Sequence, residues 1–300
     1  MTYSFSERGG DARMIRTKLL PALFLVAGTS GAGAAPSIQA DIPYATSAAG
    51  EPLRLDLYLP ESGAGAALIV WVHGGAWEAG NKSAMPLEPL IERGFAVASV
   101  DFSPASKAPF PGQVHEIKAA IRYLRAQAGR FGYDASRIGI AGASSGAHLA
   151  ALVGTSNGHA ELEGAMGEHR GESSAVHAIV SYFPATNLTT ILTQSTPFGL
   201  RIREPAVARL LGAAPKDNEA LAQAASPVFQ VDASDPPLLL LHGDLDPQMP
   251  INQSHELEGA YERLGLDAEL IVVHGAAHGG DAFYSPENVE RVAAFLNAHL

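Results

Sequence analysis

The chain has 300 residues and a formal net charge of −11 at pH 7, with 31 acidic and 20 basic side chains. An acidic balance of this size disfavours nucleic acid and anionic membrane surfaces as partners, because their phosphates repel the protein. The chain has no cysteine. It therefore has no disulfide framework, no thiolate nucleophile and no thiolate metal site, and a catalytic nucleophile in it must be an oxygen.

The first 35 residues have the three parts of a secretory signal peptide. Basic side chains come first, residues 19–26 are apolar apart from one proline, and small residues precede Pro36. The apolar part is too short to span a bilayer. We therefore expect residues 1–35 to be removed on export and the protein to be secreted or periplasmic, without a membrane span. Met14 is an alternative start of translation, and a frayed amphipathic segment is the competing interpretation.

Six stretches of the remaining chain predict β-strands. Residues 53–59 alternate between apolar and polar side chains, which is typical of a half-exposed antiparallel strand at the edge of a sheet. Five stretches are apolar almost throughout, which is typical of interior strands of a parallel sheet, and they cover residues 67–72, 96–100, 178–183, 238–241 and 269–273.

Helical patterns lie between these strands. One predicted helix has four apolar residues on a single face, namely Val114, Ile117, Ile121 and Leu124. The last helix is predicted to follow Ser285 as its N-cap, with Pro286 in its first turn. This alternation predicts an α/β fold, a doubly wound, mostly parallel sheet with helices on both faces, in one catalytic domain over residues 41–300. Residues 184–226 are the least regular and predict a small cap or loop excursion over the sheet's carboxyl edge, or a surface insertion away from substrate.

The most informative stretch covers residues 137–153. It predicts a short strand, a turn in which Gly142 and Gly146 flank Ser144 at two residues' distance, and then a helix. In this context a serine becomes a nucleophile, because the glycines let strand and helix close around a strained turn. Ser156 also fits the pattern G-x-S-x-G, but it follows the helix rather than a strand. We therefore interpret Ser156 as part of a loop.

Three other glycine-rich blocks follow predicted strands, at the edge where open α/β sheets assemble their sites. In the first, the glycines at 74–75 let main-chain N–H groups approach a reacting carbonyl oxygen, although a tight turn would also need glycine. The second offers two carboxylates, Asp244 and Asp246, and the third offers two imidazoles, His274 and His278. Spacing alone does not choose between the two aspartates. The order serine, acid, histidine is the order of α/β-hydrolase triads.

These blocks resemble the α/β-hydrolases of the esterase/lipase type and, more narrowly, the bifunctional feruloyl and acetyl-xylan esterase-like group. The resemblance extends from about residue 44 to the C-terminus. It rests on five blocks, Leu55-Asp-Leu-Tyr-Leu-Pro60, His73-Gly-Gly-x-Trp77-x-x-Gly80, Gly142-x-Ser-x-Gly-x-His-Leu-Ala150, His242-Gly-Asp-x-Asp246-x-x-x-Pro250 and Gly275-Ala-Ala-His278-Gly-Gly280.

By position, the resemblance makes Ser144 the nucleophile, Asp246 the acid and His278 the base. It leaves Asp244 as a loop-shaping carboxylate and His274 as a non-catalytic loop residue. No organic cofactor is expected. No metal site is expected either, because the 11 histidines include no pair that lies in a predicted helix with the spacing H-x-x-x-H and a nearby carboxylate. An oxyanion hole is expected from the backbone N–H groups of Gly74, Gly75, Ala76 and Ser145.

The chain departs from the family pattern in three places. Asp101-Phe-Ser-Pro104 stands where the family usually has an aromatic residue followed by an arginine that braces the loops near the oxyanion site. Ala76 replaces a third glycine of many relatives, and Ala147 replaces the glycine that commonly follows Gly146. These changes leave the triad intact and put the substrate class in doubt.

Several aromatic residues and histidines near these blocks have less certain roles. Trp77 and Phe183 lie just past strand ends, where they could line a substrate pocket or belong to the core. His73, His148 and His242 are interpreted as packed or hydrogen-bonded structural histidines.

The sequence thus predicts a serine esterase that cleaves acetyl, feruloyl or other small acyl esters through an acyl-enzyme. An amidase or exopeptidase on the same fold and a catalytically silent binding protein are the alternatives. Peptidases of this type usually carry a large extra domain, for which the chain is too short. Silent relatives typically lose a triad residue or an elbow glycine, and none is lost here.

Overall fold

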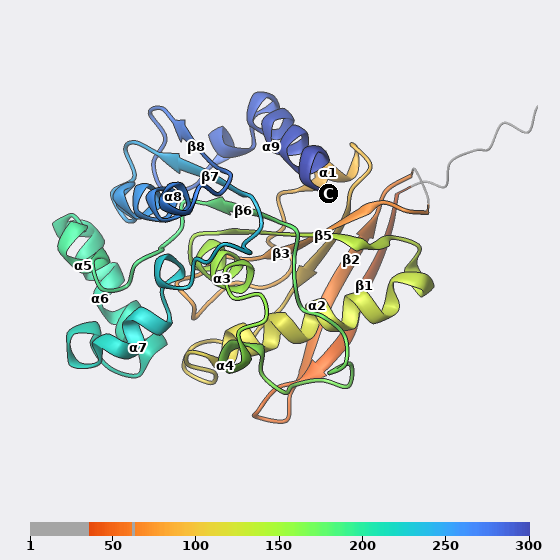
Figure 1. Ribbon diagram of the computed structural model, residues 1–300, viewed down its shortest axis with the longest axis horizontal. Helices are drawn as coiled ribbons and strands as arrows, with labels where there is room; N and C mark the ends of the chain where they lie inside the picture. The colour runs from red at the N-terminus through yellow and green to blue at the C-terminus, as the bar shows by residue number, and fades with distance from the viewer. Residues whose placement is uncertain (1–35, 62–63) are drawn as a thin grey trace, which may run out of the picture. The chain divides into compact units, whose positions relative to one another are not determined.

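The computed structural model describes residues 36–61 and 64–300. The predicted signal peptide, residues 1–35, lies outside this part of the chain and stays a prediction. The described residues form an eight-stranded sheet with helices on both faces (Figure 1). The strands lie in the order β1 (Ser37–Thr46), β2 (Pro52–Leu59), β4 (Ala96–Val100), β3 (Ala67–Val72), β5 (Asp134–Ala143), β6 (Ala178–Tyr182), β7 (Leu238–Gly243) and β8 (Ala268–Val273).

The sheet is parallel from β4 to β8, whereas β1 and β2 are antiparallel to their neighbours. The predicted α/β fold with a mostly parallel sheet is therefore confirmed. No helix of the described residues is long and apolar enough to cross a bilayer. The helices are α1 (Glu88–Ile91), α2 (Gly112–Phe131), α3 (Ser145–Gly154), α4 (Ala160–Glu163), α5 (Ile191–Gln194), α6 (Pro197–Leu211), α7 (Glu219–Ala224), α8 (Asn252–Leu264) and α9 (Pro286–His299), with short 3₁₀ turns at Pro215–Asp217, Pro227–Phe229 and Asp281–Tyr284.

Residues 53–59 form an antiparallel strand, but the prediction that this strand lies at the edge of the sheet was wrong. β1 pairs with its outer side and takes the edge, and it begins before residue 41, where the domain was predicted to start. The polar residues of β2 indicated a face open to water. Asp56 on that face is only 7% exposed, and an ion pair with Lys82 at 3.0 Å compensates its buried charge.

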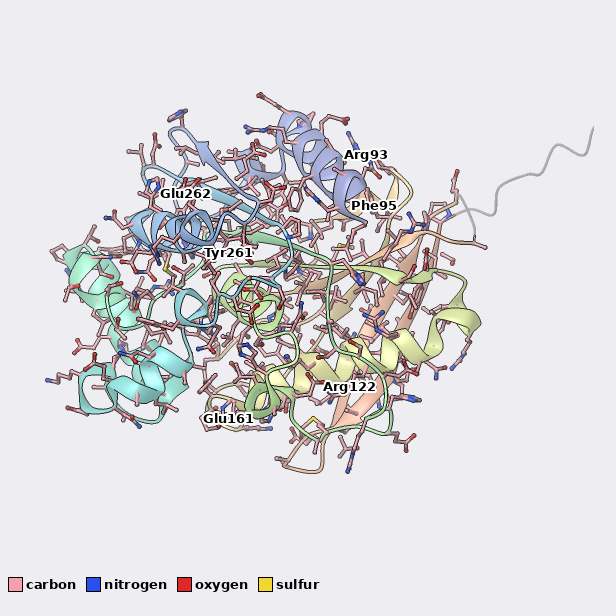
Figure 2. The ribbon with its side chains drawn as sticks, in the orientation of Figure 1. Arg93, Phe95, Arg122, Glu161, Tyr261 and Glu262 are labelled. Atoms are coloured by element: carbon pink, nitrogen blue, oxygen red, sulfur yellow. The ribbon has the colours of Figure 1, made fainter. Side chains whose placement is uncertain are left out.

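The apolar residues of the central strands divide between two hydrophobic clusters, one on each face of the sheet. In β3, Leu68 packs with residues of α2, α3 and α8, whereas its neighbour Ile69 packs with residues of α1 and α9. Successive strand residues point to opposite faces, so a continuously apolar strand needs helices on both sides. On the face of the sheet to which Leu68 points, the side chain of Arg122 extends from α2 and that of Tyr261 extends from α8 (Figure 2). The hydroxyl of Tyr261 donates a hydrogen bond to the carbonyl oxygen of Pro236.

The two helices predicted in most detail are present. The four apolar residues expected to share one face of α2 are all fully buried, and the helix ends at Gly132, whose φ of +90° costs glycine little. α9 begins as predicted, because the Ser285 hydroxyl accepts a hydrogen bond from the backbone N–H of Asn288 and Pro286 is the first helical residue.

Residues 184–226, here called the helical insertion, leave the sheet between β6 and β7. The predicted excursion from the sheet is present, and it is more regular than its sequence indicates, because it contains α5, α6 and α7, which gather beside one end of the sheet (Figure 1). α6 has 15 residues, with Thr196 as a side-chain N-cap and Val207 buried on its inner face. Pro197 and Pro205 fall in or near the helix and conceal its pattern in the sequence.

Candidate active site

The turn between β5 and α3 holds Ser144 in a strained conformation. Its φ is +56° and its ψ is −121°, a region that residues other than glycine rarely adopt. A Cβ atom on Gly142 would lie 2.4 Å from the carbonyl oxygen of Gly146, and one on Gly146 would lie 2.2 Å from that of Val72. Both glycines are required by this close approach, and the predicted strand, turn and helix around Ser144 are confirmed.

The second serine that matches the pattern has a different environment. Ser156 follows the last turn of α3 and is fully buried. Its Oγ donates a hydrogen bond to the carbonyl of Leu152 at 2.6 Å. A buried hydroxyl that is already bonded to a helix carbonyl is not available to attack a substrate.

Ser144 begins a series of hydrogen bonds through the two loops that follow β7 and β8. Its Oγ lies 2.8 Å from Nε2 of His278, and Nδ1 of His278 lies 2.6 Å from Oδ2 of Asp246. The other oxygen of Asp246 accepts the backbone N–H groups of Gln248 and Met249, both at 2.8 Å. Because a carboxylate only accepts, Nδ1 of His278 carries the proton and Nε2 is free to accept from the serine.

The carboxylate of Asp246 is kept ionised in a buried position. Its side chain has no exposed surface, and burial alone would raise its pKa. This effect of burial is outweighed by hydrogen bonds from His242, His278 and the backbone N–H of Met249. The pKa of Asp246 therefore lies well below the ordinary value of an aspartate. An ionised carboxylate at this place accepts the Nδ1 proton of His278 and fixes the orientation of its ring.

Asp244 and His274 form a separate pair. Oδ2 of Asp244 lies 2.8 Å from Nδ1 of His274, and Oδ1 accepts the backbone N–H of Gly275. The hydrogen bond from His274 holds the pKa of Asp244 below its ordinary value. The structure thus brings Asp246, and not Asp244, to the histidine that meets Ser144.

Residues 73–80, here called the glycine loop, approach Ser144 from the end of β3. A Cβ atom on Gly74 would lie 2.9 Å from the carbonyl oxygen of Ala143 and 3.4 Å from Cβ of Ser144. The next three residues all have positive φ values, +130° at Gly75, +54° at Ala76 and +62° at Trp77. Two of these are not glycines, so the loop stores backbone strain beside the serine.

Ser145 completes this side of the site. It is the first residue of α3, so its backbone N–H has no carbonyl partner inside the helix. The N-terminal end of α3 also carries the positive end of the helix dipole. Donors of this kind beside a nucleophile suit an oxygen that becomes negative during attack.

Comparison with known proteins places the chain in a family. Residues 55–261 match the family model BD-FAE. The chain belongs to the BD-FAE family. It is similar to Esterase LipQ of Mycobacterium tuberculosis, with 31% identity over 85% of this chain, although it spans only 61% of that relative's length.

Two solved structures resemble this BD-FAE member over nearly their whole length. A truncated carbohydrate esterase from gut microbiota is 31% identical, with a TM-score of 0.78 over 87% of this chain and 95% of the other. The butyrate-bound esterase Est2 of Thermogutta terrifontis is 26% identical, with a TM-score of 0.71 over 86% and 94%. These relatives are α/β-hydrolases, and the BD-FAE chain shares their fold.

The two aromatic residues that could have lined a pocket take different positions in the BD-FAE chain. Trp77 is 1% exposed and belongs to the core, so the interpretation as a pocket residue is not supported. Phe183 is 5% exposed and has a strained φ of +44°. Its ring and the imidazole of His278 form a T-shaped contact with a centroid distance of 4.8 Å, and the ring of Phe283 packs against that of Phe183 at 4.7 Å. Phe183 therefore packs against the imidazole beside Ser144.

Three other histidines of this BD-FAE chain are buried. His73 stacks on Phe102 at 4.4 Å, and burial lowers its pKa. His242 bonds to Ser254 and donates to the carbonyl of Met249. Like His148, they are fully or almost fully enclosed, as expected for structural histidines. In the described part of the chain, no group of three metal-ligating side chains is placed to hold an ion.

The helical insertion holds the loop that carries Asp246, which the sequence did not indicate. Oγ1 of Thr196 donates to the carbonyl of Pro247 at 2.8 Å, and Nη2 of Arg203 donates to Oε1 of Gln248 at 3.3 Å. Arg203 is 2% exposed, and burial lowers its pKa while the charge of Asp246 opposes that effect. These contacts pair residues about 45 to 51 positions apart, which no local pattern predicts.

Asp101 lies just before Phe102 and Ser103, the two residues that stand where the family usually has an aromatic residue followed by its bracing arginine. Its Oδ1 accepts the backbone N–H of Lys82 at 2.6 Å, and its carbonyl accepts the hydroxyl of Tyr44. Lys82 lies two residues after the end of the glycine loop. The carboxylate of Asp101 thus holds the chain just beyond this loop, in a region where the family has an arginine.

Proposed function

We propose that the protein hydrolyses carboxylic esters through an acyl-enzyme formed on Ser144. The observation that carries this proposal is the continuous series from Ser144 Oγ to His278 and Asp246, with distances of 2.8 and 2.6 Å. A serine, an imidazole in the correct tautomer and a buried carboxylate are the groups that acyl transfer to water requires.

In the proposed reaction, His278 takes the hydroxyl proton of Ser144 as Oγ attacks the ester carbonyl. Asp246 orients the imidazole and stabilises its protonated form. His278 then gives the proton to the leaving alcohol, which leaves an ester on Ser144. A water molecule attacks that ester with His278 again as base, and the acid product leaves.

The glycine loop and the start of α3 stabilise the oxyanion in this proposal. The proposed donors are the backbone N–H groups of Gly74, Gly75, Ala76 and Ser145, which belong to the loop and the helix start next to Ser144, and the dipole of α3 adds to their effect. One such donor is worth about 10² to 10³ in kcat in enzymes of this kind.

We propose small acyl esters as substrates, with acetyl and feruloyl groups on carbohydrate as the first candidates. One structural relative is a carbohydrate esterase and another binds butyrate. Initial rates on aryl esters graded by acyl length, beside acetylated xylan and methyl ferulate, distinguish these substrates. A preference for long acyl chains would contradict the proposal.

We also propose export of the protein to the periplasm or the medium. The basic, apolar and small-residue parts of residues 1–35 support it. N-terminal sequencing of the protein made in a bacterial host should give a start near Pro36. A product that retains residues 1–35 in the cytosol would contradict it.

Replacement of Ser144 tests the ester hydrolase proposal most directly. We expect Ser144→Ala to lower kcat on a p-nitrophenyl ester on the order of 10⁴-fold or more, and to abolish labelling by a fluorophosphonate probe. Ser156→Ala is the matched control and should keep both. Labelling without hydrolysis of any ester would favour an amidase, and no labelling of the wild type would favour a silent binding protein.

A further inference from the structure

A buried histidine joins three segments that are far apart in the chain. His148 lies one turn into α3 from Ser144 and has no exposed surface. Its Nδ1 lies 3.0 Å from the indole Nε1 of Trp77 in the glycine loop. Its Nε2 lies 2.7 Å from the carbonyl oxygen of Ala225, which ends α7 of the helical insertion.

The partners of His148 define its tautomer. An indole N–H can only donate, so Nδ1 of His148 must accept from Trp77. The proton is then on Nε2, which donates to Ala225. Burial lowers the pKa of His148 to about 4, against the opposing effect of the Ala225 carbonyl. The imidazole is therefore neutral near pH 7, with both nitrogens in use.

Trp77 is held at both its side chain and its backbone. Its indole donates to His148, and its carbonyl accepts the N–H of Ala105 at 2.7 Å and Nε2 of Gln113 at 2.9 Å. Positive φ values at non-glycine residues are strained and persist only where the surroundings impose them. These bonds act on Trp77, at the end of the strained stretch of the glycine loop.

A shift of Trp77 would be transmitted to the donors beside Ser144. Only two residues separate Trp77 from Gly74, and Gly74 is packed against the backbone of Ala143. The loop therefore has no free space in which to absorb a displacement on that side. Misplacement of a catalytic group by about 1 Å can cost 10²-fold in rate.

We propose that His148 is a positioning residue for the oxyanion site, which it holds in place through its hydrogen bond to Trp77. Its second bond, to the carbonyl of Ala225, keeps the proton on Nε2 and so leaves Nδ1 free to accept from Trp77. The inference rests on the proposed ester hydrolysis. A histidine that only stabilises the fold is the competing interpretation.

Two substitutions of His148 separate its two bonds. In His148→Gln the amide nitrogen lies near the position of Nε2 and can still donate to Ala225, but Trp77 loses its acceptor. In His148→Asn the amide oxygen lies near the position of Nδ1 and can still accept from Trp77, but the bond to Ala225 is lost. Trp77→Phe removes the same donor and keeps an aromatic ring in the core.

The readout is kcat and KM on p-nitrophenyl acetate, per active site titrated with a fluorophosphonate, with the folded state checked by circular dichroism. We expect His148→Gln and Trp77→Phe each to lower kcat about 10- to 100-fold with KM changed less than about threefold. The double variant should lose little more than either single variant. His148→Asn should keep kcat within about threefold of the wild type.

A second measurement separates positioning from folding. A boronic acid forms a tetrahedral anion on the serine, so its affinity should fall by about the same factor as kcat in His148→Gln and Trp77→Phe. Ser156→Ala, which loses a buried hydrogen bond on the same helix, should change the melting temperature and neither kcat nor this affinity.

Wild-type kcat per active site in both His148→Gln and Trp77→Phe, with only a lower melting temperature, would overturn the inference. Should His148→Gln not fold, Trp77→Phe decides the outcome, because it keeps the histidine. Ser144→Ala and the wild type are measured alongside. An inactive wild type or an active Ser144→Ala rejects the proposed function instead.

Discussion

The loops after β7 and β8 are joined by two Asp–His pairs with the same chemistry and very different surroundings. Asp244 and His274 lie 2.8 Å apart with 36% and 83% of their side chains exposed. Asp246 and His278 lie 2.6 Å apart with 0% and 10% exposed. The short Asp–His distance is common to both pairs, so it does not by itself identify the aspartate that orients a catalytic base. Burial of the pair and the further hydrogen bonds of its aspartate and histidine make that distinction.

The largest effect should come from removing the charge of the buried pair. We expect Asp246→Asn to lower kcat about 10⁴-fold, because the amide favours the wrong tautomer of His278 and does not stabilise the imidazolium. The measurement is p-nitrophenyl ester turnover per titrated active site. A loss smaller than that of Asp244→Asn would reverse the assignment of the acid.

The aromatic packing around His278 is the next difference between the pairs. The ring of Phe183 contacts His278, whereas His274 is largely open to water. We expect Phe183→Ala to lower kcat about tenfold, because the imidazole gains freedom to leave the line between Ser144 and Asp246. Truncation of a buried phenylalanine should also lower stability by about 3 kcal/mol. Unchanged kcat in a destabilised variant would show that Phe183 only fills space.

Much of the fold was predictable because its signals are local. Continuous apolar strands, the α2 stripe and the Ser285 cap each depend on residues close in sequence, and each is present as predicted. β1 was missed because its pattern is weak, and the strand beside it was therefore placed at the edge of the sheet. The ion pair of Asp56 with Lys82, which accompanies the burial of a polar residue of that strand, joins residues that are distant in the sequence.

The residues around Ser144 likewise divide into those that local signals predicted and those that depend on contacts between distant parts of the chain. Strand ends predicted that the serine, acid and histidine blocks meet, and the structure brings Ser144, Asp246 and His278 together. The bond from Trp77 to His148 joins residues 71 positions apart, and the bond from His148 to Ala225 spans 77. No periodicity or spacing rule reports such contacts, because they depend on how the insertion packs.

The buried aspartate should also link stability to pH. The pKa of Asp246 is lowered in the folded protein, so the unfolded chain binds a proton first as the pH falls below about 4. The stability that the carboxylate contributes is present above that pH and is lost below it. The difference in urea unfolding free energy between wild type and Asp246→Asn should therefore shrink between pH 5 and pH 3. A constant difference would contradict this linkage.

The smallest effect should come from the exposed pair. Asp244→Asn keeps an acceptor for the N–H of Gly275 and loses only the charge that faces His274. Exposed ion pairs contribute little to stability, because water and salt screen the charges and both side chains lose conformational entropy when they pair. We expect kcat within about twofold of wild type and a small stability change that disappears at about 1 M salt. A large loss of kcat at low salt would mean that the loop shaped by Asp244 controls His278, four residues beyond His274, and that the two pairs act as one unit.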